Sequence, residues 1–219
     1  MHGFRVVYED ADLLVADKPA GLLTIATATE KRRTLYAQLY ERLHRRRPAE
    51  RVFIVHRLDR DVSGLIVFAK TPAAQEALQA QFRARSAGRT YLARVEGTVR
   101  EDEFSVRTLL AESAVHRVYV TADSRRGKAA VTHVRVRSRR AGTTSVEIRL
   151  ETGRKHQIRA HLAHVGHPIV GDRRYGADPT GPTRLALHAV RLRFRHPRTG
   201  AWLEFESPAP WDRRRGPDR

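Results

Sequence analysis

Beyond Arg89 the sequence consists largely of segments in which apolar and polar residues alternate, the period of a β-strand with one buried face. Four such segments follow one another at 89–97, 115–121, 130–138 and 145–151. In the last of them, Val146, Ile148 and Leu150 share one face, and polar or charged residues share the other. Consecutive strands with few helices between them leave little room for parallel crossovers. The sequence therefore predicts an α+β protein built on a largely antiparallel sheet.

Helices are expected at three places, each with a capping or periodic signal. They run from an N-cap at Thr34 to about Leu43, onward from Thr71-Pro72, and over 156–166. The stripes expected to be buried are Leu35, Leu39 and Leu43, then Ala74, Leu78 and Phe82, then Ile158, Leu162 and Val165. Further strands are expected at 4–8, 13–17, 184–194 and 201–206. Because no linker or repeat interrupts the chain, residues 1–208 are expected to form one domain, followed by a basic, flexible tail at 209–219.

A cluster of charge separates two apolar runs in the segment "VFIVHRLDRDVSGLIVFAK", residues 52–70. The two runs, 52–55 and 64–70, are expected to be buried strands. In an extended chain Arg57 and Asp59 share one face, while His56 and Leu58 share the other. An adjacent arginine keeps a carboxylate ionised at neutral pH, so Asp59 is suited to act as a nucleophile or to stabilise positive charge. The same pair could instead be a structural ion pair, and the residues alone leave both interpretations open.

The charge balance favours a polyanionic partner. Lys and Arg total 42 against 24 Asp and Glu, a formal net charge of +18, and nearly all of the cations are arginine. Arginine binds phosphate in a bidentate way, so nucleic acid is the expected partner. The chain contains no cysteine, no apolar run long enough to span a membrane, and no apolar segment near its N-terminus. These features predict a soluble cytoplasmic protein without a membrane partner.

Five motifs, in order along the chain, resemble the RluA-type RNA pseudouridine synthases. "HRLDRDVSGLIVFAK" is similar to the family signature, with Val62 where the family usually has Thr. The others are "YEDADLLVADKPAGL", "RTYLARVEG" (with Arg89 in place of the usual Lys), "ETGRKHQIRAHLAHVGHPIVGDRRYG" and "RLALHAVRLRFRHPRTG". The resemblance implies a single catalytic domain on a largely antiparallel mixed sheet, with flanking helices and a central cleft. It also implies that this chain has no separate N-terminal RNA-binding domain.

The resemblance implies isomerisation of uridine to pseudouridine in structured ribosomal or transfer RNA, without cofactor or metal. Asp59 would be the catalytic aspartate. Arg57 would help to extrude the target nucleotide from its stack. Tyr91 would pack on the flipped base, and Arg159, lying off the apolar stripe of its helix, would leave the core face to pair with the catalytic carboxylate. His56, Arg154 and Lys155 are expected to contact the RNA.

The sequence is open to three other interpretations of its function. Four histidines, at 156, 161, 164 and 167, suggest a metal site, but only His161 and His164 share a helix face, so hydrogen-bonding roles are favoured. Asp59 and Asp61 suggest a glycoside hydrolase, but residues two apart on a strand lie side by side, not on opposite sides of a sugar bond. A non-catalytic RNA-binding module on the same fold is the third. Retention of Asp59, Tyr91 and Arg159 argues against it.

Overall fold

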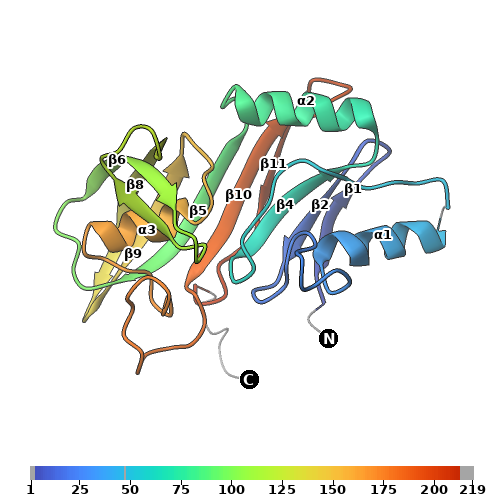
Figure 1. Ribbon diagram of the computed structural model, residues 1–219. Helices are drawn as coiled ribbons and strands as arrows, with labels where there is room; N and C mark the ends of the chain where they lie inside the picture. Colours follow the sequence, from blue (N-terminus) through green and yellow to red (C-terminus); the bar gives the residue numbers. More distant parts are fainter. Residues whose placement is uncertain (1–2, 47, 213–219) are drawn as a thin grey trace. The chain divides into compact units, whose positions relative to one another are not determined.

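The computed structural model describes residues 3–46 and 48–212. This part of the chain contains three α-helices and eleven strands, an α+β arrangement in which most neighbouring strands pair antiparallel. Its internal contacts divide the chain into two compact units (Figure 1). Unit 1 comprises Met1–Arg89 and Ala189–Arg219, and unit 2 comprises Thr90–His188. No helix within the described ranges is long and apolar enough to cross a membrane.

Unit 1 is a sheet of short strands. Its strand order is β1 (Arg5–Glu9), β2 (Leu13–Lys18), β4 (Ser63–Ala69) and β10 (Leu187–Arg195). The outer strand β11 (Trp202–Glu206) pairs with β10, and the two-residue strand β3 (Phe53–Ile54) pairs with β4. The register of β2 on β4 runs from Leu13 opposite Ala69 to Lys18 opposite Gly64. Every residue of β4 is buried, which explains its continuous apolar sequence.

Two helices of unit 1 begin where the sequence predicts. Helix α1 (Leu35–Arg46) follows Thr34, whose hydroxyl accepts a hydrogen bond from the Ala37 amide at 3.1 Å. Helix α2 (Pro72–Arg83) is capped by Thr71 in the same way, with the Ala74 amide as donor. Figure 1 shows both helices beside the unit 1 strands. The predicted α1 stripe is fully buried. The α2 stripe joins strand residues in the main core, which contains Leu13, Val15, Leu65, Val67, Leu192 and Phe194.

Unit 2 contains five further strands of the sheet, paired antiparallel with one another, and one helix packed on them. Its strand order is β5 (Gly88–Glu96), β9 (Thr143–Leu150), β8 (Lys128–Arg140), β6 (Glu103–Glu112) and β7 (Val118–Thr121). Helix α3 (Gln157–His164) packs against β7 and β8. A small core forms there from Leu110, Val118, Ala130, Ala160 and Tyr175.

Three details differ from the sequence prediction. Strand β6 was not predicted, because Leu109, Leu110 and Ala111 are consecutive apolar residues that break its alternation. The predicted strand at 52–55 is only two residues long. Val165, assigned to the apolar stripe of the third helix, is 37% exposed because α3 ends at His164 and the chain turns at Gly166. Of the predicted flexible tail, 213–219 lies outside the described residues.

Candidate active site

The loop that carries Asp59 connects β3 to β4 and is fixed from both sides by buried polar groups of unit 1. The hydroxyl of Thr24 donates to the Leu58 carbonyl at 2.7 Å and accepts from the Leu58 amide at 3.2 Å. The ammonium of Lys18 donates to the Arg60 carbonyl at 2.9 Å. Since these bonds hold the residues immediately before and after Asp59, its backbone is anchored on both sides.

Lys18 is the residue of this loop environment whose role the sequence did not reveal. Its side chain is fully buried, and its Nζ also donates to the carbonyls of Pro19 and Leu22. Burial lowers the pKa of Lys18 to about 7, against the opposing effect of the nearby Asp61 and Asp59 carboxylates. A lysine at the end of the apolar run "LLVADK" was the available signal, because an ammonium is rarely buried without a dedicated set of acceptors.

His56 and Arg57 point in different directions, as the alternation of an extended chain predicts. Arg57 is exposed, whereas the His56 ring packs on Phe82 with a centroid distance of 4.7 Å. Nε2 of His56 accepts a hydrogen bond from the Val67 amide at 3.3 Å. Burial, and next the positive charge of Arg89, lower the pKa of His56 to about 3, so the ring is neutral. These contacts attach His56 to β4. Contact with a substrate stays a prediction.

Arg159 of unit 2 forms a buried bidentate pair with Asp172. Its Nε lies 2.7 Å from Oδ2 and its Nη2 lies 2.7 Å from Oδ1. The guanidinium also lies over the ring of Tyr175, 5.0 Å from the centroid. Residues 157–162 of the short helix α3 are all buried, so Arg159 does not lie on an exposed side of the helix. Its pairing with the catalytic carboxylate stays a prediction. Asp172 was not predicted as a partner.

Tyr91 lies on β5 opposite Ile148 of β9, and only 5% of its surface is exposed within the chain. Arg154 and Lys155 lie just before α3, as predicted, and both are exposed. Arg154 donates from Nε to the Ala129 carbonyl at 3.2 Å, and Lys155 forms an ion pair with Glu112. The roles of all three residues toward RNA stay predictions, although the two cations lie on the surface that such contacts require.

Three of the four histidines of the α3 segment, His156, His161 and His167, form hydrogen bonds, the role favoured from their spacing. His161 has Thr132 at Nδ1, 2.8 Å away, and Thr108 at Nε2, 2.9 Å away. His156 contacts the Tyr175 hydroxyl at 2.9 Å. His167 contacts the Glu96 carbonyl at 2.9 Å.

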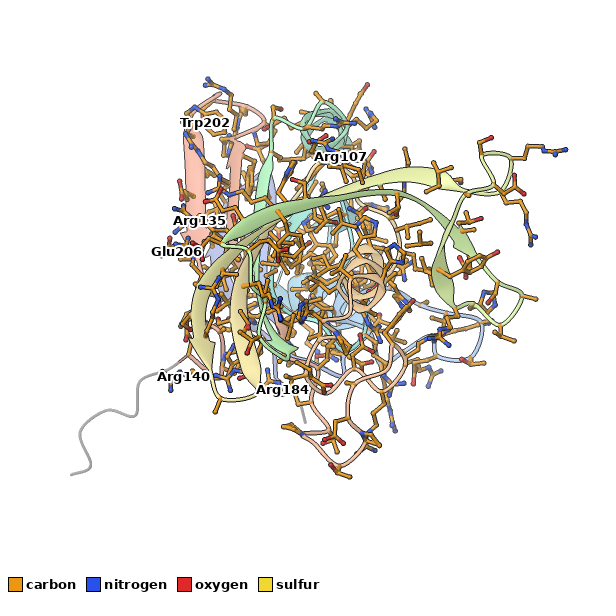
Figure 2. All side chains as sticks on the ribbon, turned by 90° about the vertical axis from the view of Figure 1, so that its left-hand side faces the viewer. Arg107, Arg135, Arg140, Arg184, Trp202 and Glu206 are labelled. Carbon is orange, nitrogen blue, oxygen red and sulfur yellow. The ribbon has the colours of Figure 1, made fainter. Side chains whose placement is uncertain are left out.

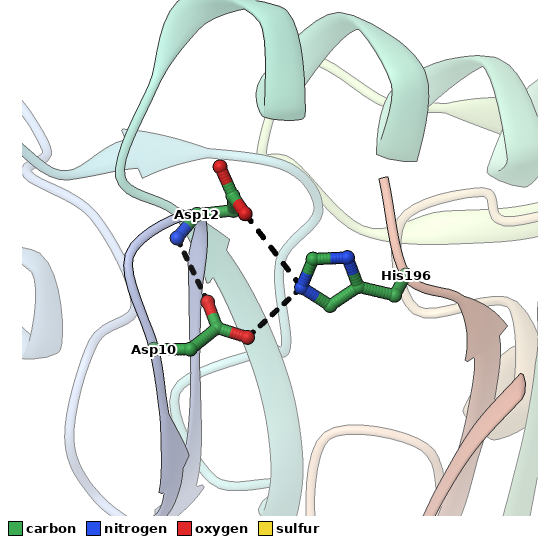
Figure 3. Close-up of side chains that lie close together, drawn as sticks. All are labelled: Asp10, Asp12 and His196. Carbon is green, nitrogen blue, oxygen red and sulfur yellow. Dashed lines mark hydrogen bonds and ion pairs between the residues drawn. The ribbon is translucent and has the colours of Figure 1, made fainter. Parts of the chain in front are cut away.

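A different grouping of metal-type side chains occurs in the described residues, formed by Asp10, Asp12 and His196 of unit 1 (Figure 3). Nε2 of His196 lies 2.9 Å from Asp10 Oδ2 and 3.7 Å from Asp12 Oδ2. Arg198 already places a guanidinium nitrogen 2.7 Å from Asp12 Oδ2. Because the Arg198 guanidinium already lies next to the Asp12 carboxylate, we interpret this cluster as a group of ion pairs and not as a metal site. It connects the β1–β2 turn to the β10–β11 turn.

Comparison with known proteins gives consistent matches over nearly the whole chain. A family model described as RNA pseudouridylate synthase matches residues 12–164. The chain is 39% identical over 222 residues to the ribosomal large subunit pseudouridine synthase D of Pseudomonas aeruginosa, covering 95% of this chain and 69% of that protein. It is also 39% identical over 211 residues to the uncharacterized RNA pseudouridine synthase YlyB of Bacillus subtilis, covering 94% and 69%.

The solved structure of human RNA pseudouridylate synthase domain containing 1 is similar, with a TM-score of 0.74 and 27% identity over 95% of this chain and 84% of that one. Human RNA pseudouridylate synthase domain containing 4 shares the fold at a TM-score of 0.77 and 24% identity, over 94% and 88%. Among the curated relatives, this chain spans between 58% and 69% of their length.

Proposed function

Because this chain belongs to the RNA pseudouridylate synthase family, we propose that it converts uridine to pseudouridine in large-subunit ribosomal RNA, with Asp59 as the catalytic residue. The observation that carries the proposal is the loop of Asp59. Its residues match the family signature, and Thr24 and Lys18 hold the backbone on both sides of the carboxylate. The ribosomal substrate is inferred from relatives such as the ribosomal large subunit pseudouridine synthase D of Pseudomonas aeruginosa. With such a substrate, we propose that the protein acts in the cytoplasm.

The proposed reaction breaks the bond from ribose C1′ to base N1, turns the base, and joins C1′ to base C5. The hydrogen on C5 leaves as a proton and N1 takes up a proton, so the product is an isomer of the substrate and no oxidant or reductant enters the balance. The step requires an ionised carboxylate held close to the sugar–base bond, and a preorganised loop provides one at little cost in reorganisation. Arg57, exposed beside the loop, would occupy the space from which the target base is withdrawn.

The supporting roles are assigned by the family motifs. Tyr91 is proposed to pack on the withdrawn base, and Arg159 to stabilise the ionised form of the catalytic aspartate. The bidentate pair with Asp172 supports the second assignment, because a guanidinium fixed at two of its nitrogens still has an N–H group to donate elsewhere. Arg154 and Lys155 are proposed to contact RNA phosphates.

The test is release of tritium from unmodified ribosomal RNA labelled at C5 of uridine. We expect release by the wild type and a loss of at least about 10³-fold with Asp59→Asn, since removal of a catalytic group costs several orders of magnitude. Asp61→Asn is the matched control, because Asp61 is an exposed carboxylate two residues away. It should retain most of the activity.

Equal release by wild type and Asp59→Asn would refute the assignment of Asp59. No release by the wild type, with RNA binding intact, would favour a non-catalytic RNA-binding module. Unmodified transfer RNA, labelled in the same way, is the second substrate. Faster release from it than from ribosomal RNA would move the proposed target to transfer RNA.

A further inference from the structure

A large groove lies within unit 1, between the N-terminal strand and helix α1. Its volume is about 1120 Å³. The walls are formed by residues from β1, from the turn after β2, from the segment before α1 and from α1 itself. Arg60 joins them from the Asp59 loop. None of these residues is among those assigned above to catalysis or substrate binding.

The groove carries an excess of positive charge. Four arginines line it, Arg33, Arg42, Arg45 and Arg60, against the two acids Glu30 and Glu41. Both acids already have contacts. Glu30 accepts hydrogen bonds from the amides of Arg32 and Arg33, and Glu41 forms an ion pair with Arg45.

Arg33 and Arg42 are exposed, and neither forms an ion pair within the described residues. The charge of Glu30 interacts with those of Arg33 and Arg60. Four arginines against two acids still leave the groove with a net positive charge, which favours an anionic occupant.

Helix α1 presents its charges to the groove because of its apolar periodicity. Leu35, Leu39 and Leu43 are buried. The groove residues Gln38, Glu41, Arg42 and Arg45 are spaced three and four apart, so they share the part of the helix that the leucine stripe leaves free. A rigid helix thus holds one side of the groove.

The groove starts at the candidate catalytic loop. Arg60 follows Asp59 directly, and its Nε donates to the Gly21 carbonyl at 3.2 Å. Gly21 and the adjoining Leu22 line the groove. An RNA strand that places a nucleotide at Asp59 therefore has a basic channel beginning one residue away, on the same unit of the protein.

We propose that this groove binds the sugar–phosphate backbone of single-stranded RNA next to the target nucleotide. The inference rests on the proposed function and adds to it a second contact surface. Arginines bind the phosphates without regard to sequence. Phe4, which also lines the groove, offers an aromatic ring on which a base can stack.

The test compares two double variants with the same change in charge. Arg33→Gln with Arg42→Gln removes two groove arginines. The control, Arg83→Gln with Arg140→Gln, removes two exposed arginines that do not line the groove, at the end of α2 and at the end of β8, where Figure 2 labels Arg140. Each lowers the net charge from +18 to +16. The probe is a fluorescein-labelled 20-nucleotide oligouridylate, followed by anisotropy over a series of KCl concentrations.

The groove variant should bind about tenfold more weakly than wild type near 0.1 M KCl. The slope of log K against log salt should fall in magnitude by about 1.4, since single strands lose about 0.7 per phosphate contact. The control should change affinity by less than about twofold. Thermal melts of Arg42→Gln alone, at an exposed helix position, check that the fold persists.

Equal losses in the two double variants would overturn the groove proposal, and so would unchanged binding by the groove variant. Tritium release from ribosomal RNA by the same wild-type sample decides the proposed function separately. A groove-specific loss of binding in a protein that releases no tritium would support the groove and refute the reaction. Normal tritium release, with equal losses of binding in the two double variants, would support the reaction and refute the groove.

Discussion

Asp172 binds the two guanidinium nitrogens Nε and Nη2 of Arg159 within unit 2. Both side chains are almost fully buried, at 6% and 2% exposure. Asp172→Asn breaks this buried ion pair, so we expect a loss of about 3–5 kcal/mol in the free energy of unfolding. Urea denaturation followed by circular dichroism measures this loss.

Glu206→Gln provides the control, because it breaks the exposed pair with Arg191 on the outer strand labelled at Glu206 in Figure 2. An exposed pair of this kind contributes about 0–1 kcal/mol. A similar, small loss in both variants would show that Asp172 does not hold the charge of Arg159 and that the buried pair is dispensable.

Single residues were predictable from the sequence where a local rule applies. The alternation of an extended chain correctly separated exposed Arg57 from buried Leu58. No such rule connects Arg159 to Asp172, because thirteen residues and the end of a helix separate them. The burial of Lys18 was equally out of reach, since its acceptors come from the turn that follows it and from the distant Asp59 loop.

The pairing of β4 with β10 depends on a glycine. A Cβ at Gly64, whose φ is +112°, would lie 2.4 Å from the carbonyl oxygen of Ala189 and 2.6 Å from its amide nitrogen. Both are backbone atoms and cannot move aside without separating the strands. We expect Gly64→Ala to abolish soluble expression or to lower the melting temperature by more than about 10 °C, the effect of several kcal/mol.

Gly200→Ala is the matched control for the Gly64 substitution. Its φ is +71°, but a Cβ there meets no atom within 4 Å. Only the backbone penalty of about 1–2 kcal/mol should appear. A Gly64→Ala protein that is as stable as Gly200→Ala would show that the two strands do not approach as closely as described.

Whole elements were predicted where their own residues contain the signal. Thr34 and Thr71 gave the starts of α1 and α2, because each hydroxyl caps the helix that follows. Strand β6 was missed because both faces of its second half carry apolar residues, which removes the period of two. The burial of helix α3 on all of its sides was not predicted, for a related reason. Its burial depends on the sheet around it, and an apolar stripe does not report that.

At the scale of the molecule, the antiparallel α+β class followed from the sequence, whereas the division into two compact units did not. The α+β class follows from consecutive strands with few helices between them, and this does not depend on where the chain is divided into units. The division depends on contacts between segments that are distant in the sequence. Ala189–Arg219 belongs to the same unit as Met1–Arg89, although all of unit 2 lies between them in the sequence. No shift in composition marks either boundary.

The stability of the whole chain should depend on pH in a way set by four buried bases. Burial lowers the pKa of His56 to about 3 and the pKa values of His156 and His161 to about 4. It lowers the pKa of Lys18 to about 7. The unfolded chain binds protons more tightly at all four groups, so the free energy of unfolding should rise with pH wherever one of them is protonated only in the unfolded state.

The histidines set the acid side, between about pH 4 and their unfolded pKa near 6.5, and Lys18 sets the alkaline side, between about pH 7 and 10.5. Urea denaturation from pH 5 to 10 measures both sides. We expect stability to increase across this range, by up to about 1.4 kcal/mol per pH unit for each titrating group. His161→Gln should reduce the slope of the free energy of unfolding against pH only below pH 6.5. Lys18→Met should reduce this slope only above pH 7. A free energy of unfolding of the wild type that is constant from pH 5 to 10 would mean that these bases are solvated. It would also contradict the anchoring of the Asp59 loop by Lys18.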